Sequence, residues 1–115
     1  LRHRESLPDL LYYSDDYLAR GGLTAILASD VRVPEDLQLV VHTNKGHAPV
    51  FPKPLTQIEV DPAAQAHEMA RLVQEVLLKP NLRLSKPVPV ASRFIIGETT
   101  RPCVTSVRSG TAVSV

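Results

Sequence analysis

Two short polar segments in this 115-residue chain carry side chains suited to holding a small ligand. Ser14-Asp15-Asp16 follows the apolar run Leu10–Tyr13, and His42-Thr43-Asn44-Lys45 follows the apolar run Leu37–Val41. Together they offer carboxylate, hydroxyl, amide and imidazole groups, which accept and donate hydrogen bonds. If both apolar runs are parallel strands, their carboxyl ends meet at one edge of the sheet, where ligand crevices lie. The two segments would then converge on one site.

Each segment also has a simpler explanation. Asp16 is most simply a helix cap, whereas Asp15 is as well placed for ligand contact as for capping. His42–Lys45 is most simply a solvated loop, and its position at the carboxyl end of a strand makes ligand contact the alternative interpretation. The predicted ligand-binding residues are therefore Asp15, Thr43 and Asn44.

Other kinds of site have little support in the sequence. The four histidines (His3, His42, His47 and His67) contain no i, i+4 pair that could bind zinc from one helix. The chain has no Gly-x-Ser-x-Gly elbow and no glycine-rich phosphate loop, and its single cysteine, Cys103, has no plausible histidine partner. We therefore expect no metal, no cofactor and no enzymatic activity.

The pattern in the first half of the chain predicts two strands with one helix between them in the sequence. Leu10–Tyr13 and Leu37–Val41 read as buried strands, and the helix between them is predicted over Tyr17–Ser29. Gly21-Gly22 within that helix costs about 1 kcal/mol per glycine, which close approach to a neighbouring sheet would offset. The proline-rich stretch His42–Pro54 is predicted to be irregular.

The second half predicts strands at Leu55–Val60 and Ala91–Ile96, separated by a helix over Pro62–Leu78 with Asp61 as its N-cap. From Thr99 onward no pattern is sustained, so we expect that stretch to be mobile or extended. Strands alternating with helices are typical of an α/β fold. We predict a three-layer αβα arrangement around a mainly parallel sheet.

Composition limits the class of protein. Hydrophobic residues make up 43% and charged residues 22%, as in soluble globular proteins, and no apolar run approaches the roughly 20 residues that span a bilayer. A net charge of +1 predicts no tight DNA binding by this chain alone. The chain lacks an initiator Met and the apolar core of a signal peptide, so we expect it to continue a larger protein or to follow a removed tag.

Several segments, read in order, resemble the C-terminal part of the effector domain of LacI/GalR-type transcription regulators. Pro8–Ala19 resembles that family's "PDAIFCANDxLA", and Val31–Asp36 matches "LRVPED". Leu37–Val41 corresponds to the strand that leads into "GFDD". Pro54–Ile58 resembles "PPLTTI", and Gly97–Pro102 resembles the closing "RESTAP". The resemblance covers most of the chain.

The resemblance implies a partial lobe of a periplasmic-binding-protein-like fold, in which a small molecule binds between two lobes. Residues 1–102 would be the C-terminal portion of this ligand-sensing domain, and residues 103–115 a flexible tail. DNA would be bound only through a module absent from this chain, and the protein would be cytoplasmic. The alternative is a fragment of an exported solute-binding protein with the same lobes.

The implied pocket departs from the family pattern at several positions. Asp15 stands where the family usually has an effector-binding Asn, and Thr43 and Asn44 replace its acidic pair. Val60 stands where a polar pocket residue is frequent. A sugar-like ligand is still implied, although two acceptors that sugars commonly use are missing.

The predicted helix Pro62–Leu78 carries an apolar stripe. In the family, the corresponding helix packs in the other lobe, so here the stripe would be exposed and large enough to need covering. We expect either a symmetric homodimer, in which this helix covers the sheet of a second copy, or a helix folded back on its own sheet. The stripe consists of Ala66, Met69, Ala70, Val73, Val76 and Leu77.

Overall fold

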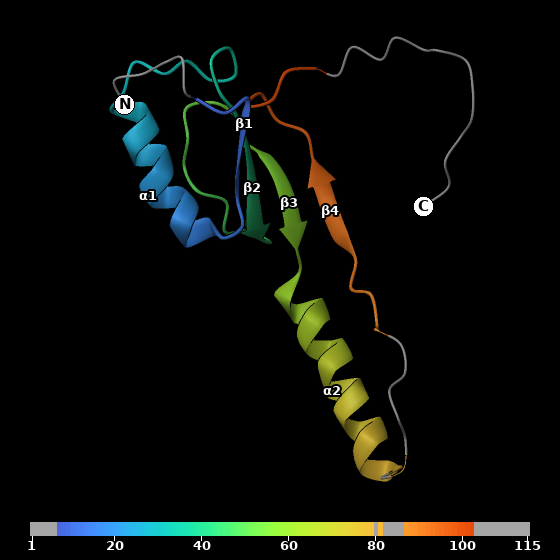
Figure 1. Ribbon diagram of the computed structural model, residues 1–115. Coiled ribbons are helices and arrows are strands. Elements are labelled where there is room, and N and C mark those ends of the chain that lie inside the picture. Colours follow the sequence, from blue (N-terminus) through green and yellow to red (C-terminus); the bar gives the residue numbers. More distant parts are fainter. Residues whose placement is uncertain (1–6, 80, 82–86, 103–115) are drawn as a thin grey trace, which may run out of the picture.

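The computed structural model describes residues 7–79, 81 and 87–102, so the predicted tail 103–115, with Cys103, lies outside the described residues. Four strands and two helices follow along the chain in the order strand, helix, strand, strand, helix, strand (Figure 1). The α/β class with a mainly parallel sheet is confirmed. The elements are β1 (Leu10–Tyr13), α1 (Asp16–Leu27), β2 (Gln38–Asn44), β3 (Thr56–Val60), α2 (Pro62–Leu78) and β4 (Ser92–Ile95).

The sheet has the strand order β1-β2-β3-β4. β1, β2 and β3 are parallel, with Tyr12 beside Val40 and Val40 beside Thr56, and β4 runs antiparallel to β3. β2 continues through Asn44, which corrects the expectation that regular structure stops at Val41. Residues 42–44 carry no proline, so their N–H groups can stay in the ladder with β3, and the irregular stretch begins only after them.

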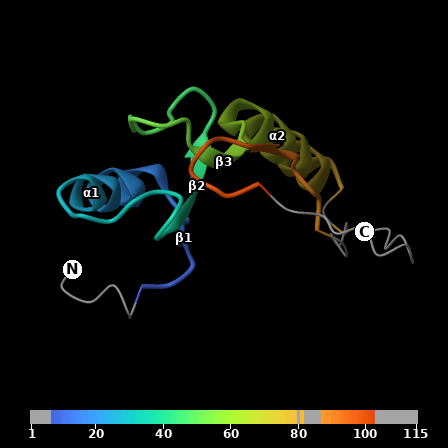
Figure 2. The same cartoon turned by 90° about the horizontal axis from the view of Figure 1, so that it is seen from above.

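The helix α1 covers one face of this sheet (Figures 1 and 2). Its N-cap is Asp15, whose carboxylate accepts hydrogen bonds from the N–H groups of Tyr17 and Leu18. The buried side chains of α1 follow helical spacing and are Asp16, Ala19, Leu23 and Ile26. The predicted close approach is confirmed at Gly22, where a Cβ would collide with the ring of Tyr13, whereas Gly21 has open space around it.

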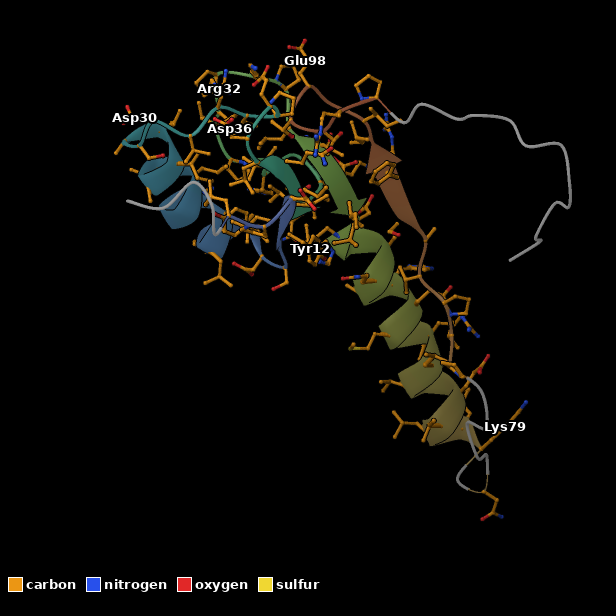
Figure 3. The ribbon with its side chains drawn as sticks, turned by 45° about the horizontal axis from the view of Figure 1, so that its top comes forward. Tyr12, Asp30, Arg32, Asp36, Lys79 and Glu98 are labelled. Atoms are coloured by element: carbon orange, nitrogen blue, oxygen red, sulfur yellow. The ribbon has the colours of Figure 1, made fainter. Side chains whose placement is uncertain are left out.

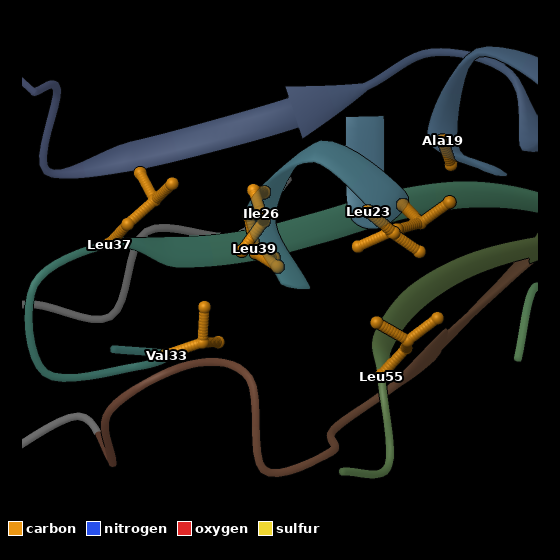
Figure 4. Packing of buried hydrophobic residues seen from close by; sticks show 8 residues of the cluster. Ala19, Leu23, Ile26, Val33, Leu37, Leu39 and Leu55 are labelled. Atoms are coloured by element: carbon orange, nitrogen blue, oxygen red, sulfur yellow. The ribbon is translucent and has the colours of Figure 1, made fainter. Parts of the chain in front are cut away.

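The core lies between α1 and the face of β2 that carries Leu39 and Val41 (Figure 4). β1 was predicted to be buried, and this is wrong for half of its side chains. Leu11 and Tyr13 pack against the core, but Leu10 and Tyr12 are 44% and 46% exposed. Side chains of a strand alternate between the two faces of the sheet, and no described helix covers the second face.

The turn before β2 is held by an ion pair within the segment that resembles "LRVPED". The Arg32 guanidinium donates to Asp36, with 2.7 Å between Nη2 and Oδ1, and the Arg32 N–H donates to the same carboxylate. Figure 3 shows both residues beyond the C-terminal end of α1. The hydrogen bond to Asp36 raises the pKa of Arg32.

The helix α2 begins as predicted, with Asp61 as its N-cap and Pro62 as its first residue. It extends away from the sheet, and its C-terminal neighbour Lys79 lies far from β1 (Figures 1 and 3). No α2 residue is buried, and Met69 and Val73 are 67% and 52% exposed. The alternative in which α2 folds back on its own sheet is therefore wrong. Of the three expected layers, the described residues form two, the sheet and α1.

The stretch from Thr99 onward was expected to be mobile or extended, and its first residue, Thr99, is instead fully buried against the sheet. Its hydroxyl accepts from the Thr56 N–H and donates to the Leu39 carbonyl, both at 2.9 Å. The Leu39 N–H in turn donates to the Thr99 carbonyl. Gly97 packs so closely on the backbone of Leu55 that a Cβ would collide with it. These contacts join residues 97–100 to β2 and to the start of β3.

Candidate functional site

A small pocket lies at the carboxyl ends of the three parallel strands. It encloses about 80 Å³, which is well below the roughly 300–1,000 Å³ of complete small-molecule sites. Its lining comes from the ends of β1, β2 and β3 and from the start of α1, and consists of Ser14, Asp15, Asp16, His42, Thr43, Asn44 and Val60.

The three residues predicted to bind the ligand all line this pocket. Asp15 follows β1, and Thr43 and Asn44 end β2. Val60, singled out as a departure from the family pattern, ends β3 and lines the same pocket. Parallel pairing of β1 with β2 and of β2 with β3 brings these strand ends together, as the alternation of strands and helices implied.

Two of these side chains are already engaged within the chain. Asp15 Oδ1 accepts from the N–H groups of Tyr17 at 2.8 Å and Leu18 at 3.2 Å, which makes it the cap of α1. Thr43 is 2% exposed, and its hydroxyl donates to Gln57 Oε1 at 3.0 Å. Both side chains are thereby held in fixed orientations.

Three further polar residues, Ser14, Asp16 and His42, line the pocket and were not among the three predicted ligand contacts. Asp16 was interpreted as a cap, but Asp15 makes the capping bonds, and Asp16 is the first helical residue and is 4% exposed. His42 was treated as part of a loop, but it lies in β2. The signal for Asp16 was available in the sequence, because it begins the same helical row as Ala19 and Leu23.

An ion pair stands at the edge of this pocket. Lys45 and Asp61, which directly follow β2 and β3, are joined with 2.7 Å between Nζ and Oδ2. The Lys45 N–H also donates to the Val60 carbonyl. The hydrogen bond to Lys45 lowers the pKa of Asp61, and the same bond raises the pKa of Lys45. Because Asp61 balances this cation, Lys45 offers little charge to neutralise Asp15 and Asp16.

Larger pockets exist, and two of them lie on apolar surface that no other part of the described chain covers. One of about 580 Å³ lies on the open face of the sheet beside Leu10, Val40 and Phe94, and one of about 390 Å³ lies between α2 and the chain before β4. Both are lined mainly by apolar side chains, whereas a few placed polar groups are what orient a small ligand. The pocket at the strand ends is therefore the better candidate despite its size.

Two other kinds of feature, a metal cluster and a membrane-spanning helix, do not occur in the described part of the chain. Across residues 7–79, 81 and 87–102, no three His, Cys, Asp or Glu side chains are gathered as ligands of one ion. No helix in that part of the chain is long and apolar enough to cross a membrane.

Sequence comparison identifies the class of domain. A family model described as a periplasmic binding protein-like domain matches residues 1–100, so the chain belongs to this family. Domains of this type bind ligands, and the four-stranded, mostly parallel sheet with its helices is consistent with one partial lobe. No curated protein and no solved structure gives a significant match to the chain.

Proposed function

We propose that this chain is the effector-sensing part of a DNA-binding transcription regulator of the LacI/GalR type, and that it binds a sugar-like molecule between two lobes. The observation that carries the proposal is the convergence of polar strand-end residues on one pocket in a domain of the periplasmic binding protein-like family. On this proposal the chain acts by binding, without catalysis and without a cofactor. DNA is contacted by a separate module, and the protein is cytoplasmic.

The segments Val31–Asp36 and Pro54–Ile58 favour a regulator, because they match regulator motifs. The matched family's description equally fits the second candidate, a fragment of an exported solute-binding protein. The coding sequence upstream of Leu1 separates the two. A helix-turn-helix there supports the regulator, whereas a signal peptide followed by the first lobe would overturn it in favour of the exported protein.

The proposed ligand contacts are Asp15, Thr43 and Asn44. Asp15 can accept hydrogen bonds from sugar hydroxyls but cannot donate when ionised. Thr43 and Asn44 replace acidic groups, so the ligand meets a hydroxyl and an amide at that point. The combination favours a ligand rich in hydroxyl groups over one that carries phosphate.

The test of the site uses the full-length protein. Asp15→Ala should reduce the response to effector while leaving DNA affinity in its absence intact, because Asp15 lies at the ligand end of the sheet. Asp9→Ala, at the opposite end of β1, is the matched control for loss of a carboxylate. An unchanged effector affinity in Asp15→Ala would remove Asp15 from the site.

We also propose a homodimer for the chain itself. The apolar stripe of α2 and the open face of the sheet are both uncovered in one copy. A two-fold exchange would place the α2 helix of each copy on the sheet of the other and would cover both surfaces at once.

A further inference from the structure

The pocket at the strand ends contains two buried polar atoms with no hydrogen-bond partner. They are Asp16 Oδ1 and His42 Nε2, and no other buried side-chain nitrogen or oxygen in the described residues is in this position. Both residues line the same pocket of about 80 Å³. Buried polar atoms are almost always paired, because an unpaired one forfeits its hydrogen bonds to water. Because both unpaired atoms lie in one pocket, we infer that a bound ligand supplies their missing hydrogen-bond partners.

Helix capping does not account for the burial of Asp16. Its neighbour Asp15 already satisfies the first N–H groups of α1, so Asp16 is not needed as a cap. It lies at the start of the buried row that continues through Ala19 and Leu23, and this row holds its carboxylate against the sheet. The Lys45 ammonium group at this end of the sheet is paired with Asp61. The carboxylate is therefore held in place with an oxygen available for an incoming donor.

The two atoms differ in what they demand of a ligand. An ionised carboxylate only accepts, so Asp16 Oδ1 needs a donor. Nε2 of a neutral imidazole donates or accepts according to the tautomer. A hydroxyl group both donates and accepts, so it satisfies Asp16 and either tautomer of His42. A protonated amine only donates, and a phosphate would meet two carboxylates of its own sign, those of Asp15 and Asp16.

We propose that Asp16 and His42 bind neighbouring hydroxyl groups of a neutral polyol, with Asp16 accepting from one of them. This inference rests on the proposed function and names the residues that determine ligand class in the same pocket. On this proposal Asp16 supplies a buried acceptor for one ligand hydroxyl, and His42 donates to or accepts from the next one according to its tautomer. Asp15, Thr43 and Asn44 line the same pocket around these two residues. The site selects for hydroxyl groups and against anions.

The experiment uses the ¹⁵N-labelled chain and follows backbone amide shifts by NMR, which detects weak binding. The probes are D-galactose, D-ribose and myo-inositol as neutral polyols, D-glucosamine as the cation and D-glucose 6-phosphate as the anion. We expect saturable shifts around residues 14–16 and 42–44 with at least one neutral polyol, weaker shifts with glucosamine and none with the phosphate.

The variants are Asp16→Asn and His42→Gln, each with a matched control outside the pocket. Asp16→Asn should weaken polyol binding about ten- to a hundredfold, since a hydrogen bond to a charged group becomes one to a neutral amide. Its melting temperature without ligand should hold or rise, because an unpaired buried charge is removed. His42→Gln should also weaken binding. The controls Asp9→Asn and His67→Gln, at exposed positions, should leave binding unchanged.

The outcomes separate this inference from the proposed function. Polyol binding at the pocket that survives Asp16→Asn and His42→Gln would overturn the inference and leave the function standing. Preferential binding of glucosamine or of the phosphate would overturn the ligand class while keeping a small-molecule site. A loss of melting temperature in ligand-free Asp16→Asn would mean that Asp16 is structural. No shift with any probe would count against both proposals.

Discussion

Adjacent residues of this chain have unlike surroundings, and the two glycines of α1 are the clearest case. A Cβ at Gly22 would meet the ring of Tyr13, which packs against the core, whereas a Cβ at Gly21 would meet nothing within 4 Å. Gly22 is thus required by the contact between α1 and β1. Gly21 carries only the conformational cost of glycine in a helix.

The substitutions Gly21→Ala and Gly22→Ala should therefore change stability in opposite directions. Gly21→Ala should stabilise the chain by up to about 1 kcal/mol through helix propensity. Gly22→Ala gains the same propensity but must displace the Tyr13 ring, and overpacking costs about 1–3 kcal/mol, so the net effect should be destabilising. Urea denaturation of both variants measures the difference. Equal stabilisation by the two alanines would show that α1 does not approach β1 so closely.

At the scale of elements, the segment after β4 behaves as part of the sheet. Thr99 bridges β2 and the start of β3 through its hydroxyl and its backbone carbonyl. The neighbouring Thr100 hydroxyl lies 2.8 Å from the hydroxyl of Thr56 and is only partly buried. The two threonines thus offer a graded test of how this segment is anchored.

Thr99→Val keeps the side-chain shape and leaves the buried Thr56 N–H without its acceptor. This should cost about 1–3 kcal/mol, the range for an unmade buried hydrogen bond. Thr100→Val removes a partly buried bond between two hydroxyls and should cost about 0.5–1.5 kcal/mol. Chemical denaturation of the two variants gives both values. The anchoring would be disproved if Thr99→Val were no more costly than Thr100→Val.

The ion pair between Lys45 and Asp61 links the end of β2 to the start of α2. Because folding lowers the pKa of Asp61, its contribution to stability is present above its unfolded pKa, near 3.9, and is lost as the pH falls through the folded value. At neutral pH the melting temperature should fall from wild type to Asp61→Asn and again to Asp61→Ala. Asn keeps the helix cap but loses the ion pair, whereas Ala loses both.

Thermal melts of the three proteins between neutral and strongly acid pH test this. The gap between wild type and Asp61→Asn should close as Asp61 becomes protonated and should shrink in high salt. The gap between Asp61→Asn and Asp61→Ala should persist, since the Asn cap does not titrate. A wild-type advantage that stays constant at low pH would contradict the assignment.

The whole molecule has two uncovered apolar surfaces. One is the sheet face that carries Leu10, Tyr12 and Phe94, and the other is the α2 stripe with Met69 and Val73. Monomeric soluble proteins rarely expose apolar patches of more than a few hundred Å². In a dimer, the α2 stripe of one copy would cover the exposed sheet face of the other copy.

Because both apolar surfaces are uncovered in one copy, we predict that the chain self-associates. Sedimentation equilibrium at several concentrations should show a dimer, and the double substitution Met69→Lys with Val73→Lys should shift it to monomer by placing charge in the stripe. Gln74→Lys, which adds a charge to the polar side of α2, is the matched control and should leave the dimer intact. A wild-type chain that stays monomeric at all concentrations would contradict the exchange.

Local chemistry determined much of this protein in advance. Asp61 and Pro62 identified the start of α2, the glycine pair indicated close packing of α1, and alternating strands and helices predicted the parallel sheet. Polar residues after two strands then located the pocket, because parallel pairing brings those ends together. These features depend on residues near one another in sequence or on a general rule of topology.

Only the tertiary structure decided which groups in the pocket remain unpaired. By residue type both Asp15 and Asp16 are able to cap α1, and their roles separate because Asp15 accepts from the first N–H groups of α1 whereas Asp16 is buried. The half-exposed state of β1 and the burial of Thr99 likewise depend on partners distant in the chain. Burial is a property of what packs against a residue, and for these residues the neighbours come from segments whose approach no local pattern specifies.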